Sequence, residues 1–157
     1  MDESPERPAL TFRPASESDT EFARDVHGRA YRDVVVQQFG SWDEERQAAF
    51  FDDAWSKPGF EIISMDGTDV GYRCVEVRDD AVVVHELVIV PEVQHHGIGT
   101  ALLGEAQHVA RALAKPLRLQ VLKANQASEL YGRLGFQVTG ETDTHLEMEW
   151  TPGEPED

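Results

Sequence analysis

The segment from Ala81 to Thr100 constrains the fold of this chain more than any other part of the sequence. Ala81 to Val90 is a nearly continuous β-branched run, which predicts a central strand buried on both faces. Pro91 ends this strand, and a loop containing Gly97 and Gly99 leads into an apolar stripe with helical spacing. The stripe consists of Ile98, Leu102, Ala106, Val109 and Leu113. A buried strand that feeds a helix in this way indicates an α/β domain.

The other segments alternate between strand and helix signals. Strands are predicted over residues 10–13, 60–65, 70–77, 117–121, 136–141 and 145–150. Helices are predicted through Phe22, Val26 and Tyr31, from a capping box at Ser41-Trp42-Asp43-Glu44 to about Trp55, and over 128–134. The order β-α-α-β-β-β-α-β-α-β-β predicts one domain over residues 1–157, with a mixed, mostly antiparallel sheet flanked by helices. We expect an ordered core over about residues 9–150, with acidic, proline-containing tails at 1–8 and 151–157.

Charge and cysteine content exclude several classes of function. The 14 Lys and Arg residues against 30 Asp and Glu give a net charge of −16, which disfavours a nucleic-acid partner. No apolar run has the length that a membrane span needs, and the single Cys74 cannot form an internal disulfide, so we expect a cytoplasmic protein. The acidic surface has two interpretations: solvation in a salty cytosol, or a field that attracts cationic substrates such as amines.

The two glycines at the start of the helix after Pro91 predict an anion site. A helix N-terminus exposes unpaired N–H groups and the positive end of the helix dipole, and glycine lets a phosphate approach closely. The segment lacks the lysine of a Walker loop, and Leu102 stands where a dinucleotide fingerprint needs its third glycine. From the glycines alone, a helix start that binds no ligand is an equal interpretation.

Two motifs in the chain resemble those of the GNAT superfamily of N-acetyltransferases. Leu87-x-Ile89-x-Pro91 followed by Gln94-x-x-Gly97-x-Gly99 is similar to its acetyl-coenzyme A motif. Leu119-x-Val121-x-x-x-Asn125-x-x-Ala127-x-x-Leu130-Tyr131-x-x-x-Gly135-Phe136 has the form that the superfamily shows after its next strand. Arg13-x-Ala15-x-x-x-Asp19 also resembles its usual opening, so the resemblance covers roughly residues 10–150.

The resemblance implies that acetyl-coenzyme A is bound as the acyl donor. The backbone of residues 94–100 would cradle its pyrophosphate, and backbone groups of Leu87 and Ile89 would pair with the pantetheine arm and polarise the thioester carbonyl. Asn125 would contact the pantetheine or the phosphate end. The candidate cofactor-binding residues are Leu87, Ile89, Gln94, His95, His96, Gly97, Ile98, Gly99, Thr100 and Asn125. Adjacent histidines point apart and His95-His96 has no third ligand pattern, so we expect phosphate contacts there and no metal.

The same resemblance implies that Tyr131 protonates the leaving thiolate. A phenol with a pKa of about 10 stays protonated at neutral pH and can protonate a thiolate with a pKa of about 8.5 when it is well placed. The structural alternative for Tyr131 is a core aromatic residue that packs beside Phe136.

The general base is less constrained by the sequence. Glu86 interrupts the apolar central strand just before the cofactor segment and is the first candidate, followed by His85 and then Glu76. The alternative for Glu86 is a carboxylate at a solvated sheet edge or in an ion pair with Arg73 or Arg118.

The acyl acceptor is the least determined part of the prediction. We expect an N-acetyltransferase that moves an acetyl group to a primary amine by direct attack in a ternary complex. The amine belongs to a small metabolite, an antibiotic, or a protein N-terminus or lysine, and the family often forms homodimers. A non-catalytic acyl-coenzyme A sensor is the alternative from another functional class. Six aromatic residues in the first two helices are candidates for the acceptor groove or the core: Tyr31, Phe39, Trp42, Phe50, Phe51 and Trp55.

Overall fold

The computed structural model describes residues 9–94 and 97–153, and its elements follow the predicted order with two short 3₁₀ turns added. The strands are β1 (Leu10–Pro14), β2 (Phe60–Met65), β3 (Thr68–Val77), β4 (Val82–Ile89), β5 (Leu117–Leu122), β6 (Gln137–Glu141) and β7 (His145–Trp150). The helices are α1 (Thr20–Phe39), α2 (Glu44–Trp55), α3 (Ile98–Ala112) and α4 (Ala127–Arg133), and the 3₁₀ turns are η1 (Glu17–Asp19) and η2 (Pro91–Val93). The predicted tail at 1–8 and the last four residues of the tail at 151–157 lie outside the described residues. In the described part of the chain, no helix combines the length and apolar character that crossing a bilayer requires.

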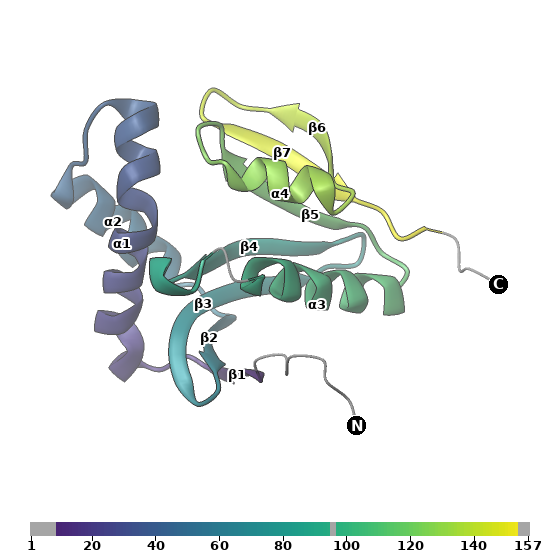
Figure 1. Cartoon of the computed structure of the whole chain (residues 1–157), viewed down its shortest axis with the longest axis horizontal. Coiled ribbons are helices and arrows are strands. Elements are labelled where there is room, and N and C mark those ends of the chain that lie inside the picture. Colours follow the sequence, from purple (N-terminus) through teal and green to yellow (C-terminus); the bar gives the residue numbers. More distant parts are fainter. Residues whose placement is uncertain (1–8, 95–96, 154–157) are drawn as a thin grey trace.

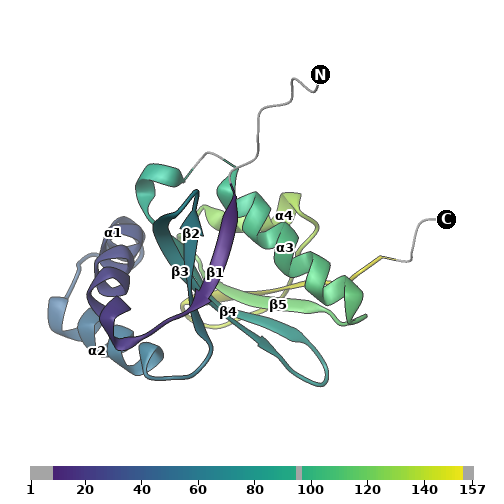
Figure 2. The same ribbon diagram turned by 90° about the horizontal axis from the view of Figure 1, so that it is seen from below.

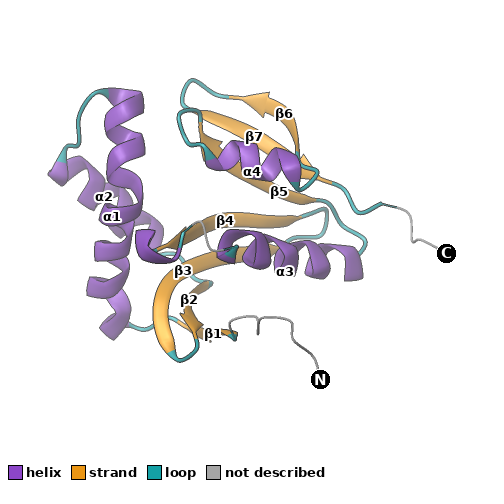
Figure 3. Cartoon of the chain, viewed as in Figure 1, coloured by secondary structure: helices purple, strands orange, loops and turns teal. Residues whose placement is uncertain are grey.

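All seven strands form one sheet in the order β1-β2-β3-β4-β5-β7-β6. Every neighbouring pair is antiparallel except β4 and β5, so the prediction of a mixed, mostly antiparallel sheet is confirmed. Helices α1 and α2 lie on one side of the sheet, and α3 and α4 lie on the other (Figures 2 and 3). The central strand β4 is therefore covered on both faces, as its β-branched sequence indicates.

The parallel pair at the centre of the sheet separates along its length. Pairing among the described residues is limited to Val82 with Leu117, Val83 with Arg118 and Val84 with Leu119. Strand β4 continues to Ile89 and β5 continues to Leu122, and the two strands diverge from each other (Figure 1). Facing backbone edges of both strands are thus left without a strand partner in the middle of the sheet.

A β-bulge at His85 sets which side chains of β4 face which helices. Cys74 pairs with Glu86 and Val75 with Val84, so His85 is an extra residue without a partner on β3. The bulge places Val84 and Leu87, three residues apart, against the same core beneath α3. Glu86 then faces the opposite side, toward α1 and α2.

The apolar stripe of α3 is confirmed over most of its length but not at its end. Ile98, Leu102 and Ala106 are buried as predicted, whereas Leu113 is 43% exposed and Ala110 is fully buried in its place. The helix ends at Ala112, and Ala114 has a left-handed backbone with φ of 54°, so the chain turns before Leu113 reaches the core.

The predicted capping box at the start of α2 is wrong. The cap is Asp43, whose backbone is extended and whose Oδ1 accepts a hydrogen bond from the Arg46 backbone N–H at 3.0 Å. Glu44 is therefore the first helical residue, and Ser41 lies outside the helix. A carboxylate at this position accepts a hydrogen bond from a free N–H and also interacts favourably with the positive end of the helix dipole. These two effects explain why Asp43 is the cap.

Candidate active site

The two glycines of the predicted anion site lie at the N-terminus of α3. Gly97 has φ of 78°, a left-handed conformation that other residues adopt only with strain. The first hydrogen bond of the helix runs from Ala101 N–H to the Gly97 carbonyl, so the N–H groups of Ile98, Gly99 and Thr100 have no partner within the helix. The Ile98 side chain is buried in the core, which leaves only its backbone for a ligand. The predicted phosphate contacts His95 and His96 lie outside the described residues.

Helix α4, which belongs to the second motif, lies close to the N-terminus of α3. A Cβ added at Gly99 would meet Leu130 Cδ2 at 3.5 Å, so the glycine faces the side chains of α4. Asn125 lies two residues before that helix, and its Oδ1 accepts a hydrogen bond from Ala127 N–H at 2.9 Å in an Asx turn. The structure therefore gives Asn125 a local structural role. Its contact with the acyl donor remains a prediction.

Leu87 and Ile89 present backbone groups to the gap between β4 and β5. Val90 N–H donates to the Val70 carbonyl on β3 at 2.8 Å. Because successive residues of a strand direct their backbone groups to opposite edges, Leu87 and Ile89 direct theirs away from β3 and toward β5. Gln94 Nε2 donates to the Ile89 carbonyl at 3.1 Å, and it thereby ties the loop before α3 to this edge.

Glu86 is the only one of the three base candidates that faces the helical layer of α1. Its Oε2 accepts a hydrogen bond from the Tyr31 hydroxyl at 3.4 Å. Burial raises the pKa of the Glu86 carboxyl to about 7, and the bond from Tyr31 opposes this shift only in part. Burial, together with the nearby Glu86, also raises the pKa of the Tyr31 and Tyr72 phenols, so both stay protonated.

The other two base candidates lie together at the surface. His85 Nε2 is 2.8 Å from Glu76 Oε1, and Glu76 also accepts a hydrogen bond from Arg78. Both side chains are more than one third exposed, so they form a surface pair on the β3–β4 hairpin.

Arg73 and Arg118, the two ion-pair partners that the sequence suggests for Glu86, pair with other carboxylates. Arg73 contacts Glu61 at 3.1 Å and Glu105 at 2.5 Å, and its guanidinium lies over the Phe12 ring. Arg118 pairs with Asp80 and Glu149 instead. Glu86 accepts a hydrogen bond from a phenol and forms no ion pair with these arginines, which is consistent with its raised pKa.

Tyr131 lies on α4, on the β5 side of the gap. Its ring packs against Phe136 with the ring centroids 5.8 Å apart, and burial raises the pKa of its phenol. Tyr131 is also close enough to contribute to the raised pKa of Tyr31. The packing beside Phe136 that the sequence suggests is therefore present, and the phenol is held in its protonated form beside the Tyr31–Glu86 pair.

Gln38 joins three segments at the far end of the gap, and sequence reasoning missed it. Its Nε2 donates to the Thr144 carbonyl at 2.8 Å, and its Oε1 accepts from Ala124 N–H at 2.9 Å. Helix α1 is thereby fastened to the β6–β7 turn and to the loop that carries Asn125. No sequence signal marks this glutamine, because its partners are backbone groups about 100 residues away.

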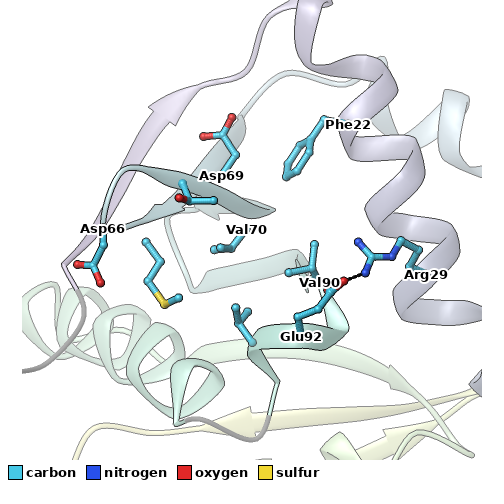
Figure 4. Close-up of a pocket in the computed structure, with 10 residues that line it drawn as sticks. Phe22, Arg29, Asp66, Asp69, Val70, Val90 and Glu92 are labelled. Atoms are coloured by element: carbon cyan, nitrogen blue, oxygen red, sulfur yellow. Dashed lines mark ion pairs between the residues drawn. The ribbon is translucent and has the colours of Figure 1, made fainter.

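Two hollows lie on the side of the sheet covered by α1 and α2. The larger, about 510 Å³, lies between α1, the β2–β3 hairpin and η2, where Arg29 and Glu92 form an ion pair across it (Figure 4). None of the predicted site residues lines this hollow. The smaller, about 70 Å³, lies between α2 and the sheet and is lined in part by Glu86. We call this smaller hollow the α2 cavity.

Comparison with known proteins agrees with this geometry. The family model of the acetyltransferase (GNAT) domain matches residues 57–138, which is more than half of the chain. The PaiA N-acetyltransferase from Thermoplasma acidophilum, solved with coenzyme A, is 21% identical over 91% of this chain and 99% of that chain, with a TM-score of 0.73. The ribosomal-protein-S18-alanine N-acetyltransferase from Escherichia coli is 19% identical over 95% of this chain and 97% of that chain, with a TM-score of 0.65. No curated protein sequence matches. The two motifs, the fold and the family model agree, and the chain belongs to the GNAT family of acetyltransferase domains.

Proposed function

We propose that this domain transfers an acetyl group from acetyl-coenzyme A to a primary amine, with Glu86 as the general base and Tyr131 as the general acid. The observation that carries the proposal is the gap between β4 and β5. A free strand edge at Leu87 and Ile89 lines this gap and leads to the N-terminus of α3, while Glu86 lies on β4 and Tyr131 lies on α4, the helix that follows β5.

The residues around the gap fit the acyl donor. The unpaired N–H groups of Ile98, Gly99 and Thr100 offer donors to a pyrophosphate, and the dipole of the 15-residue helix α3 favours its negative charge. The free edge of β4 offers backbone donors and acceptors to the amide groups of a pantetheine arm. One N–H of that edge would also polarise the thioester carbonyl.

Glu86 would take a proton from the acceptor ammonium. With a pKa of about 7, its carboxyl is partly ionised at neutral pH and is a better match for a proton acceptor than an ordinary glutamate. The hydrogen bond from Tyr31 fixes the orientation of Oε2 and leaves Oε1 for the incoming proton.

Tyr131 would supply the second proton. As the new carbon–nitrogen bond forms, the carbon–sulfur bond breaks and the thiolate must be neutralised. A phenol whose pKa is raised by burial remains protonated over the whole neutral range. The thiolate is the weaker base, so the proton transfer depends on the placement of the phenol beside the sulfur. The nitrogen loses a second proton as the tetrahedral species collapses, and this proton restores the Tyr131 phenol, while Glu86 releases its proton to solvent. The products are the acetylated amine, the free thiol and one proton.

Calorimetric titration with acetyl-coenzyme A, followed by thiol release in the presence of primary amines, tests this function. We expect stoichiometric binding that Gly99→Leu abolishes, because the new side chain fills the space between α3 and α4. Gly104→Leu is the matched control, since an added Cβ on this glycine of α3 meets nothing within 4 Å. Folded protein that does not bind acetyl-coenzyme A refutes the proposal. Binding without thiol release from any small amine or from a peptide N-terminus or lysine identifies a sensor.

A further inference from the structure

The α2 cavity is an aromatic pocket beside the proposed base. Most of its wall consists of rings from α2, β2 and β3, which are Phe50, Phe51, Trp55, Phe60 and Tyr72. The rings pack against one another, with Trp55 4.9 Å from Phe60 and 5.6 Å from Tyr72 between centroids. Trp55 Nε1 donates to Thr20 Oγ1, so the polar edge of this ring is already bonded. The wall therefore presents a largely apolar surface to whatever enters.

The polar groups of the wall gather near Glu86, which is the only carboxylate among the lining residues. Tyr72 pairs with Val88, so it is a diagonal neighbour of Glu86 on the same face of the sheet, and Glu86 contributes to the raised pKa of its phenol. His27 also belongs to the lining, but its Nε2 is enclosed by protein, and Gln47 of α2 is a hydrogen-bond partner of the imidazole. The remaining lining side chains are one alanine and the rings of α2 and β2. The cavity thus has a carboxyl end and an apolar end.

Glu86 lies between this cavity and the gap where β4 and β5 diverge. The cavity is on the side of β2 and β3, which supply Phe60 and Tyr72 to its wall. The gap is on the opposite side of β4, where the strand edge is free. A primary amine bonded to Glu86 can therefore point its nitrogen toward a thioester in the gap and its carbon chain into the cavity.

The wall fits a short alkyl chain that ends in an amine. The Glu86 carboxylate complements an ammonium group and repels an anion. A second polar group at the apolar end would lose its water and find no partner among the aromatic rings. An apolar cavity of about 150 Å³ holds the six carbons of benzene, so the volume of about 70 Å³ accommodates about three carbons.

We infer that the α2 cavity is the side-group pocket of the acceptor site and that it selects primary alkylamines with an apolar chain of about three carbons. This inference rests on the proposed function. It adds the acceptor class, which the family assignment does not give. It also makes Phe50 and Ala54, which line the cavity from α2, specificity-determining residues.

Thiol release with amines of increasing length tests the size of the pocket. We compare methylamine, n-propylamine and n-hexylamine at saturating acetyl-coenzyme A. Each buried methylene group should raise kcat/KM about fourfold, so n-propylamine should exceed methylamine by about fifteenfold. The chain of n-hexylamine is longer than the cavity accommodates, and its kcat/KM should fall below that of n-propylamine.

Two polar probes of the same length as n-propylamine test the apolar end. Ethanolamine and ethylenediamine carry a hydroxyl or an amino group in place of the methyl group. We expect kcat/KM for each to be at least about tenfold lower than for n-propylamine, because the polar group is buried without a partner. Both probes are less basic than n-propylamine, so a larger share of each is unprotonated and basicity does not cause this preference.

Two variants of α2 should move the size limit in opposite directions. Ala54→Leu extends a side chain into the cavity and should bring the ratio of kcat/KM for n-propylamine to that for methylamine close to one. Phe50→Ala removes a partly exposed wall and should raise kcat/KM for n-hexylamine above that for n-propylamine. Ala49→Leu, at an exposed position of the same helix, is the matched control and should keep the parent ratios. Calorimetric titration with acetyl-coenzyme A shows that each variant is folded.

The outcomes separate the inference from the proposed function. Equal kcat/KM for methylamine and n-propylamine, a value that still rises to n-hexylamine, or a preference for either polar probe overturns the inference and leaves the acetyltransferase assignment standing. Parent ratios in Ala54→Leu also overturn it, as does turnover of peptide amines alone. Failure to bind acetyl-coenzyme A, or binding without turnover of any amine, removes the proposed function and the inference together.

Discussion

Replacing Glu86 by glutamine should make the protein more stable and less active at the same pH. The carboxyl has a pKa of about 7 in the folded protein against an ordinary value of 4.5. Since one pKa unit corresponds to about 1.4 kcal/mol, the ionised side chain destabilises the fold by roughly 3 kcal/mol. Glutamine removes this charge and can still accept the hydrogen bond from Tyr31.

The pH dependence of this effect has a definite sign. Below pH 4.5 the carboxyl is protonated in both the folded and the unfolded chain, so its burial does not yet lower the free energy of unfolding. As pH rises from 4.5 toward 7, the unfolded chain ionises first and the folded protein loses stability relative to it. Above pH 7 the loss is complete. The advantage of Glu86→Gln over the parent protein therefore grows from nearly zero at pH 4.5 to roughly 3 kcal/mol at pH 8.

Urea denaturation of both proteins across this pH range measures the difference directly. In parallel, thiol release should fall by about 10²–10⁴-fold in the variant, the usual contribution of a general base, with an unchanged Kd for acetyl-coenzyme A. Glu76→Gln is the matched control, because Glu76 is an exposed carboxylate on the neighbouring strand. A stability difference that does not vary with pH would refute the burial argument. Turnover that Glu86→Gln leaves intact would refute the assignment of the base.

Four further outcomes test other parts of the structure. Tyr131→Phe should lower kcat by about 10²-fold or more at unchanged affinity for acetyl-coenzyme A, measured by thiol release and calorimetry. Gly97→Val should weaken that affinity and lower stability by about 1–2 kcal/mol, because φ is 78°; calorimetry and urea denaturation report the two effects. Arg73→Leu leaves Glu61 and Glu105 without their shared cation and should destabilise the fold by about 1–3 kcal/mol in urea. If the charge of −16 reflects adaptation to salt, the thermal midpoint should rise between low and molar KCl, and a flat midpoint contradicts that interpretation.

Much of the architecture could be predicted because the local signals agree with the global fold. The β-branched run before Pro91, the Asp66-Gly67 turn and the apolar stripe of α3 each specify an element without help from distant residues. In the structure Asp66 and Gly67 both have positive φ, as a two-residue type I′ hairpin turn requires. Such consistency explains why the order of all strands and helices is confirmed.

The prediction is wrong or incomplete where the local sequence allows more than one arrangement. Ser41 and Asp43 are both good caps, and only the path of the chain into α2 decides that Asp43 is used. The bulge at His85 has no residue signature, because it depends on the register with β3. That bulge gives Glu86 its orientation, so the environment of the predicted base could not be derived from the sequence.

The partners of the site are missed for a similar reason. Gln38 and Tyr72 are distant in sequence from both motifs, and each reaches the site through the packing of a helix or strand. Nothing in the local sequence distinguishes Gln38 from an ordinary helix residue. Its hydrogen bonds to Thr144 and Ala124 become visible only when α1 and the sheet are assembled.

The three residue pairs between β4 and β5 also have a consequence for motion. They are the only strand pairing between β1–β4 and β5–β7–β6 in the described residues, so the sheet consists of two well-paired halves with a short seam. Amide hydrogens near the seam should exchange through openings that leave each half intact, at a lower free energy than global unfolding. A molecule lying along the seam would bond both halves at once and slow that exchange. Under the proposed function, the acyl donor would complete the sheet along this seam before the chemistry begins.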